Sequence, residues 1–154
     1  MKIQSLKIST LATPLVIACG LLAASAPAWA DSNEGPCSNR TLSGDYGFSL
    51  KGVLFPAPGL SLPFRGVVMV HYDGKGNFTQ LDHVVTNGVP PAQEWRPGSG
   101  TYTVNQNCTG ISVINIPGNP QPTITVHFVL VKQGQEIFQV VDGNAVTSVG
   151  IKVE

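Results

Sequence analysis

Three histidines and the carboxylates near them are the side chains in this chain best suited to acid–base or metal chemistry. His71 and His83 flank a turn at residues 73–77, so two paired strands would bring them close together with Asp82 beside them. His127 stands alone. No two histidines have the short spacing of a zinc motif, and no closely spaced cysteine pair accompanies them. We therefore expect solvated strand histidines, with no metal and no cofactor.

Asp82 and Glu94 are the acidic residues closest to apolar strand sequence. A carboxyl group that faced an apolar interior would have its pKa raised by desolvation and could serve as a general acid or base. Alternation instead predicts that Asp82 faces water, on the side opposite Leu81 and Val85. Glu94 is flanked by prolines, and we expect it to form a surface ion pair with Arg96.

Motifs for nucleophilic catalysis and for phosphate binding are absent from the sequence. There is no G-x-S-x-G and no Ser-x-x-Lys. Gly74-Lys75-Gly76 is too short for a phosphate loop and belongs to a turn. Lys and Arg total nine, as do Asp and Glu, and no basic run occurs, which argues against nucleic acid as a partner.

The elements that would position these residues are β-strands. Gly, Thr, Val and Asn are abundant, and apolar and polar residues alternate, with turn residues roughly every eight to twelve positions. The segment 55–63 holds three prolines and is expected to be an apolar loop. A short edge strand is an option over 93–96. The main strands are expected at 45–54, 64–72, 78–86, 101–104, 110–116, 123–131, 137–141 and 145–153.

About eight strands joined by short connections predict an antiparallel meander, because neighbours in sequence must pair. Closure of such a sheet removes its edges, and eight strands enclose an interior that fits side chains or one small ligand. We therefore expect an all-β, up-and-down barrel. A two-sheet β-sandwich has the same alternation and remains the alternative.

Alternation also predicts which side chains face the interior. On the strand over 64–72, Val68 and Val70 share the inner face, whereas Met69 and His71 share the outer one. On the next strand we expect Leu81 inside.

The first thirty residues are typical of a secretory signal peptide. Lys2 and Lys7 precede an apolar run over 11–24, and Ala28-Trp29-Ala30 offers a cleavage site. The run is shorter than the ~20 residues of a membrane-spanning helix, so we expect no span and an exported, periplasmic or secreted protein. Val16-Ile17-Ala18-Cys19 resembles a lipobox, which leaves a lipoprotein at Cys19 as the lesser alternative.

Two cysteines follow the predicted signal peptide of residues 1–30. An even count in an exported chain predicts one disulfide between Cys37 and Cys108, with two buried thiols as the alternative. The bridge would tie an N-terminal segment, residues 31–44, to a barrel domain over 45–154. In the chain-entropy account, closing so long a loop is worth ~4 kcal/mol.

Three groups of short motifs lie along the chain after residue 36. They are Cys37-Ser38-Asn39 with Thr41 to Phe48, Tyr72 to Asn77, and Gly100 to Asn105 with Cys108-Thr109-Gly110. These motifs resemble those of a group of small exported bacterial proteins of largely unknown function. The resemblance spans roughly residues 37–153 and implies a calycin-like barrel, similar to lipocalins and allene oxide cyclases. The shared residues are turn glycines, aromatics and the two cysteines, so they imply a fold and a disulfide but no catalytic residue.

The function that these features favour is the binding of a small apolar or amphipathic ligand inside the barrel, with the apolar loop near its mouth. A cyclase or isomerase that uses His83, Asp82 or Glu94 is one alternative. An extracellular interaction protein acting through strand edges or loops is another, and the oligomeric state is left open. The expected ligand-binding residues are Phe48, Val68, Tyr72, Leu81, His83, Trp95 and Phe128.

Overall fold

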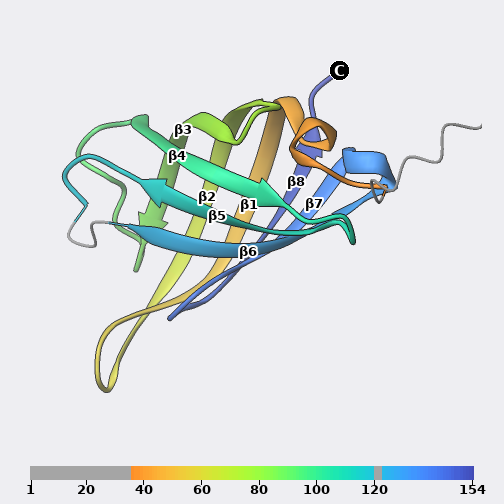
Figure 1. The fold of residues 1–154 in the computed structure, drawn as a ribbon. Coiled ribbons are helices and arrows are strands. Elements are labelled where there is room, and N and C mark those ends of the chain that lie inside the picture. Colours follow the sequence, from red (N-terminus) through yellow and green to blue (C-terminus); the bar gives the residue numbers. More distant parts are fainter. Residues whose placement is uncertain (1–35, 120–122) are drawn as a thin grey trace, which may run out of the picture. The chain divides into compact units, whose positions relative to one another are not determined.

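The computed structural model describes residues 36–119 and 123–154. The predicted signal peptide, including Cys19, lies outside the described residues. Strands make up most of the described chain (Figure 1). Its elements are the 3-10 helix η1 (Asn39–Thr41), β1 (Ser43–Ala57), β2 (Leu60–Asp73), β3 (Asn77–Thr86), β4 (Arg96–Val104), β5 (Thr109–Asn115), β6 (Ile124–Val131), the 3-10 helix η2 (Lys132–Gly134), β7 (Glu136–Val141) and β8 (Ala145–Lys152).

The eight strands form a closed antiparallel barrel in sequence order. Each strand pairs with the next one along the chain, and β8 returns to pair with β1, from Tyr46↔Lys152 to Val53↔Ala145. Figure 1 shows the strands wrapped around one interior. The predicted meander and barrel are confirmed, and the sandwich alternative is wrong, because the last strand bonds to the first.

The expected loop over 55–63 is instead the end of a long hairpin. Ala57 pairs with Leu60 across the turn that Gly59 closes with a φ of +79°. In Figure 1 this hairpin extends beyond the barrel. The prediction was wrong because a two-stranded ribbon past the end of β8 has free edges, where a proline removes no ladder hydrogen bond. No edge strand forms over 93–96, since β4 begins at Arg96.

One end of the barrel is closed by the N-terminal segment and a group of tyrosines. The Tyr72 ring forms T-shaped pairs with the rings of Tyr46 and Tyr102, at centroid distances of 5.5 and 5.1 Å. Tyr46 donates its hydroxyl to the Gly134 carbonyl at 2.6 Å, and Tyr102 donates to the Leu42 carbonyl at 2.7 Å. Burial raises the pKa of all three phenols, so they stay neutral.

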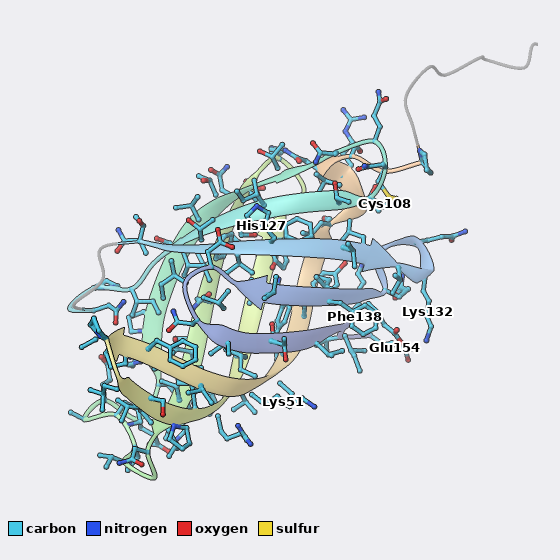
Figure 2. The ribbon with its side chains drawn as sticks, turned by 90° about the horizontal axis from the view of Figure 1, so that it is seen from below. Lys51, Cys108, His127, Lys132, Phe138 and Glu154 are labelled. Atoms are coloured by element: carbon cyan, nitrogen blue, oxygen red, sulfur yellow. A yellow bond between two sulfur atoms is a disulfide. The ribbon has the colours of Figure 1, made fainter. Side chains whose placement is uncertain are left out.

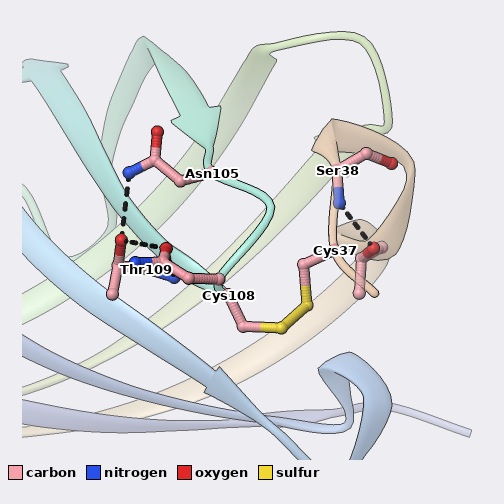
Figure 3. The surroundings of a disulfide bond; sticks show 7 residues. Cys37, Ser38, Asn105, Cys108 and Thr109 are labelled. Carbon is pink, nitrogen blue, oxygen red and sulfur yellow. Dashed lines mark hydrogen bonds between the residues drawn. A yellow bond between two sulfur atoms is a disulfide. The ribbon is translucent and has the colours of Figure 1, made fainter. Parts of the chain in front are cut away.

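A disulfide holds this closing segment in place. Cys37 and Cys108 are bonded across a sequence separation of 71 residues, as predicted, and Figure 3 shows the bridge between the segment before η1 and the β4–β5 turn. Asn39 accepts a hydrogen bond from the Val104 amide at 2.8 Å. The segment is thus held by a covalent bond and by a hydrogen bond between the Asn39 side chain and the backbone of β4.

Three phenylalanine rings pack against glycines inside the barrel, and we call these three contacts the waist of the barrel. Each ring lies over an inward-facing glycine on a neighbouring strand, where a Cβ atom would overlap the ring. A glycine leaves an unfilled place in a sheet, and an aromatic ring from the adjacent strand covers it. The pairs are Phe48 over Gly150, Phe78 over Gly100 and Phe128 over Gly110.

Candidate ligand-binding site

The barrel interior opposite the tyrosine end is hollow. It contains a cavity of about 210 Å³, whose inner limit includes Tyr72 and Phe78. The antiparallel order brings the ends of β1, β3, β5 and β7 to this open end, together with the starts of the other four strands. The mouth is formed by lining residues at these strand ends, which include Leu54, Phe64, Thr86, Ile116, Ile124 and Asn144.

The cavity walls are mainly aliphatic, and they come from strands on all sides of the barrel. This composition follows from alternation, since every second residue of each strand faces inward. The free energy falls when an apolar molecule replaces water against such walls. Representative wall residues are Val68, Val70, Ile114, Val126, Val141 and Val146.

A buried ion pair interrupts this apolar wall. Arg96 donates from Nε to Asp82 Oδ1 at 2.7 Å and from Nη2 to Oδ2 at 3.1 Å. The side chain of Asp82 is 3% exposed and that of Arg96 is 26% exposed. Gln80 also approaches Asp82, with Nε2 at 3.4 Å from Oδ2. A bidentate guanidinium contact of this kind offsets the desolvation of the carboxylate.

This arrangement overturns two expectations. Asp82 does not face water but lies inside the barrel, and Arg96 pairs with it instead of with Glu94. The physical reason is register. Val68 pairs with Asp82, and Asp82 pairs with Arg96, so all three side chains share the inner face of the sheet.

Other polar groups line the same cavity. Ser112 is 1% exposed, and its hydroxyl has no hydrogen-bond partner among residues 36–119 and 123–154. Ser148 donates its hydroxyl to Gln139 Oε1 at 2.9 Å. Burial raises the pKa of Tyr72, and a hydrogen bond with the Gln139 side chain partly offsets this rise. Ser112 is therefore a hydrogen-bonding group that the described chain leaves unused.

The predicted ligand-binding residues are divided between two faces of the sheet. Phe48, Val68 and Tyr72 line the cavity, whereas Phe128 lies in the packed core and outside the cavity lining. Leu81 is 48% exposed on the outer face, so its expected interior position is wrong. That Phe48, Val68 and Tyr72 contact a ligand stays a prediction.

His83 and Trp95 form a separate contact outside the barrel. His83 donates from Nδ1 to the Glu94 carbonyl at 2.5 Å, and its ring lies 5.9 Å from the Trp95 ring. Because His83 shares the outer face with Leu81, neither it nor Trp95 belongs to the cavity lining. The loop 87–95, which carries Trp95, begins and ends at the open end of the barrel.

The other two histidines also face outward and pair with carboxylates. His71 Nδ1 lies 2.7 Å from Asp45 Oδ1, and His127 Nδ1 lies 2.9 Å from Asp142 Oδ1, with all four side chains exposed. The described part of the chain contains no group of three His, Cys, Asp or Glu side chains that could hold a metal. Within the same residues, no helix is long and apolar enough to cross a membrane.

Several polar residues of the described cavity lining were missed by sequence reasoning, among them Gln80, Arg96, Ser112, Gln139 and Ser148. A signal for one of them was present. If Val68 and Val70 face inward and the 73–77 turn joins paired strands, the partners of these valines on the next strand must face inward too. Those partners are Asp82 and Gln80. Because Leu81 is apolar, it suggested that the opposite set of residues on this strand faces inward.

The outer surface carries an apolar band over β6, β7 and β8. Val129 pairs with Phe138, and Phe138 pairs with Val149, so the three side chains are neighbours on one face. They are 41%, 44% and 39% exposed. Figure 2 labels Phe138 of this band. The interaction hypothesis therefore loses the edges of the barrel sheet, because the barrel is closed. It keeps the free edges of the ribbon beyond β8 and an exposed apolar surface.

No protein-family model, no curated protein and no solved structure matches this chain. The resemblance to calycin-like exported proteins is accordingly supported by the eight-stranded closed barrel alone.

Proposed function

We propose that this protein binds one small, mostly apolar molecule inside the open half of its barrel. The observation that carries the proposal is the cavity of about 210 Å³ with aliphatic walls and the unused, buried hydroxyl of Ser112. Buried polar groups in folded proteins nearly always have a partner, so an unpartnered hydroxyl in a hollow site indicates a group that a ligand completes.

The volume limits the size of the ligand. An apolar cavity of about 150 Å³ accommodates benzene, so this larger one suits a substituted single ring or an aliphatic molecule of similar bulk. Longer ligands would have to extend through the mouth, between the ribbon over 54–63 and the strand ends. Binding is favoured over catalysis because none of the three histidines lines the cavity, and Asp82, the one carboxylate among its described lining residues, is held in a bidentate contact by Arg96.

We also propose that the binding takes place outside the cytoplasm. The Cys37–Cys108 bridge supports this location, because such a bond persists in oxidising compartments. Expression of the full chain in a bacterium, followed by fractionation and mass analysis of the recovered protein, tests it. Processing after Ala30 and recovery outside the cytoplasm would support export. An unprocessed cytoplasmic chain would contradict it.

A cavity-filling substitution tests the binding function. Val141→Phe places a ring into the cavity, whereas Val140→Phe adds the same ring to the outer face of the same strand, where residue 140 is 46% exposed. Calorimetric titration with acetophenone should give saturable binding to the wild type and to Val140→Phe and none to Val141→Phe. Equal binding by both variants would place the ligand elsewhere and reject the proposal.

A further inference from the structure

The cavity contains more hydrogen-bond donors than the chain itself uses. A guanidinium group has five N–H bonds, and Asp82 accepts one from Nε and one from Nη2 of Arg96. Ser112 adds a hydroxyl that has no partner in the described residues. Both residues line the cavity. A ligand that offers an acceptor oxygen can therefore be recognised without displacing any contact within the protein.

The charges in the cavity balance. Asp82 and Arg96 are the only carboxylate and cation among the described lining residues, and they are paired with each other. Tyr72 remains neutral, because burial raises the pKa of its phenol. An anionic ligand would therefore bring an uncompensated charge into an apolar site. Its carboxylate would also find the Nε–Nη2 edge of Arg96 occupied and the Asp82 carboxylate close by.

We infer that the cavity selects an uncharged ligand with one acceptor oxygen, such as an aryl ketone or a phenol, and that Asp82 excludes carboxylates by neutralising Arg96. This inference rests on the proposed binding function and names its ligand class. Ser112 donates the hydrogen bond that recognises the ligand oxygen. Asp82 sets specificity through Arg96 and does not itself contact the ligand.

One substitution should reverse this selectivity. Asp82→Asn retains the size of the side chain and removes its charge, which leaves Arg96 as an unpaired cation in the cavity. A ligand carboxylate can then supply the missing charge through a bidentate contact. Asp45→Asn is the matched control, since it removes the same charge from an exposed aspartate that is paired with His71.

Three probes of similar shape separate the contributions: acetophenone, ethylbenzene without the oxygen, and benzoate with a charge. For the wild type at pH 7, calorimetric titration should show acetophenone bound about tenfold more tightly than either of the others. Ser112→Ala should remove the preference for acetophenone over ethylbenzene. Asp82→Asn should bind benzoate at least as tightly as acetophenone, whereas Asp45→Asn should behave like the wild type.

The outcomes distinguish this inference from the function it rests on. Benzoate bound by the wild type as tightly as acetophenone, or ethylbenzene bound equally well, would overturn the ligand class while leaving the binding function intact. Failure of all three probes to bind would overturn both. If Asp82→Asn does not fold, the double variant Asp82→Asn/Arg96→Gln keeps the cavity neutral. It should retain acetophenone and reject benzoate, and tight benzoate binding by it would overturn the role of the ion pair.

Discussion

The two ends of this barrel differ in how completely their buried polar groups are partnered. At the closed end, the hydroxyls of Tyr46 and Tyr102 both donate to backbone carbonyls, and a disulfide holds the covering segment in place. In the open half, the buried Ser112 hydroxyl has no partner in the described chain and faces a cavity. The comparison indicates that the closed end stabilises the fold, while the open half keeps hydrogen-bonding capacity for a ligand.

The same comparison applies to packing. Near the waist, rings cover inward glycines so closely that no Cβ atom fits, as with Phe128 over Gly110. Beyond the waist, aliphatic side chains leave about 210 Å³ unfilled. Substitutions at the waist and closed end should therefore change stability more than binding, and those in the open half should do the reverse.

Loss of the disulfide should have the largest effect on stability. The double variant Cys37→Ser/Cys108→Ser should lower the free energy of unfolding by about 4 kcal/mol. Without the bridge, the unfolded chain regains the conformational entropy that closure of a long loop removes. Urea denaturation followed by tryptophan fluorescence measures the change. Where the variant is folded, its affinity for acetophenone should equal that of the wild type. A loss below about 1 kcal/mol would mean that the bridge is not a main support of the closed end.

Overpacking of the waist should come next. Gly110→Ala should lower the free energy of unfolding by about 1–3 kcal/mol, since the added methyl overlaps the Phe128 ring. Gly47→Ala is the control, because a Cβ there meets no atom within 4 Å. Thermal unfolding of both variants compares them. Equal melting temperatures would show that the ring moves aside freely and that the waist is not tightly packed.

Removal of one hydroxyl from each half of the barrel should affect the free energy of unfolding differently. Tyr46→Phe leaves the buried Gly134 carbonyl unpaired and should lower the free energy of unfolding by about 1–3 kcal/mol. Ser112→Ala removes a group that has no partner in the described residues and should leave stability unchanged or raise it by up to about 1 kcal/mol. Matched urea titrations measure both. A destabilised Ser112→Ala would show that the hydroxyl already has a partner.

The smallest effect should be a pH dependence at the β2–β3 turn. Hydrogen bonds from the Asn77 side chain and from the Asn77 and Lys75 amides hold the pKa of Asp73 at about 2, below its ordinary value of 3.8. The stability that this depression contributes is present above pH 3.8 and is lost as the pH falls towards 2. Asp73→Asn should therefore flatten the acid limb of a melting-temperature profile. An unchanged limb would contradict the assignment.

The fold could be predicted from the sequence because turn residues at regular intervals enforce short connections, and short connections enforce a meander. Closure was foreseen from the number of strands. The interior was foreseen only in part. Val68 and Val70 alternate cleanly with outward residues, whereas Leu81 is more apolar than its inward neighbours Gln80 and Asp82. Pairing across the turn, rather than hydrophobicity, decides which face of that strand is buried.

The cavity itself could not be predicted from alternation. Its volume depends on how far each inward side chain reaches across the barrel, and therefore on close contacts such as Phe48 over Gly150, which join residues distant in sequence. The hairpin at 55–63 was missed for a different reason. Its prolines are compatible with strand conformation only because the ribbon continues beyond the neighbouring strands.

Chemical-shift mapping tests the central claim most directly. Amide resonances of the ¹⁵N-labelled protein would be followed while acetophenone is added. Binding in the cavity predicts saturable shifts at Ser112, Val126 and Val146, whose side chains line it, and little change at Phe138 and Val149 on the outer face. Shifts confined to Phe138 and Val149, or no saturable shift at any residue, would contradict the assignment of the barrel interior as the ligand site.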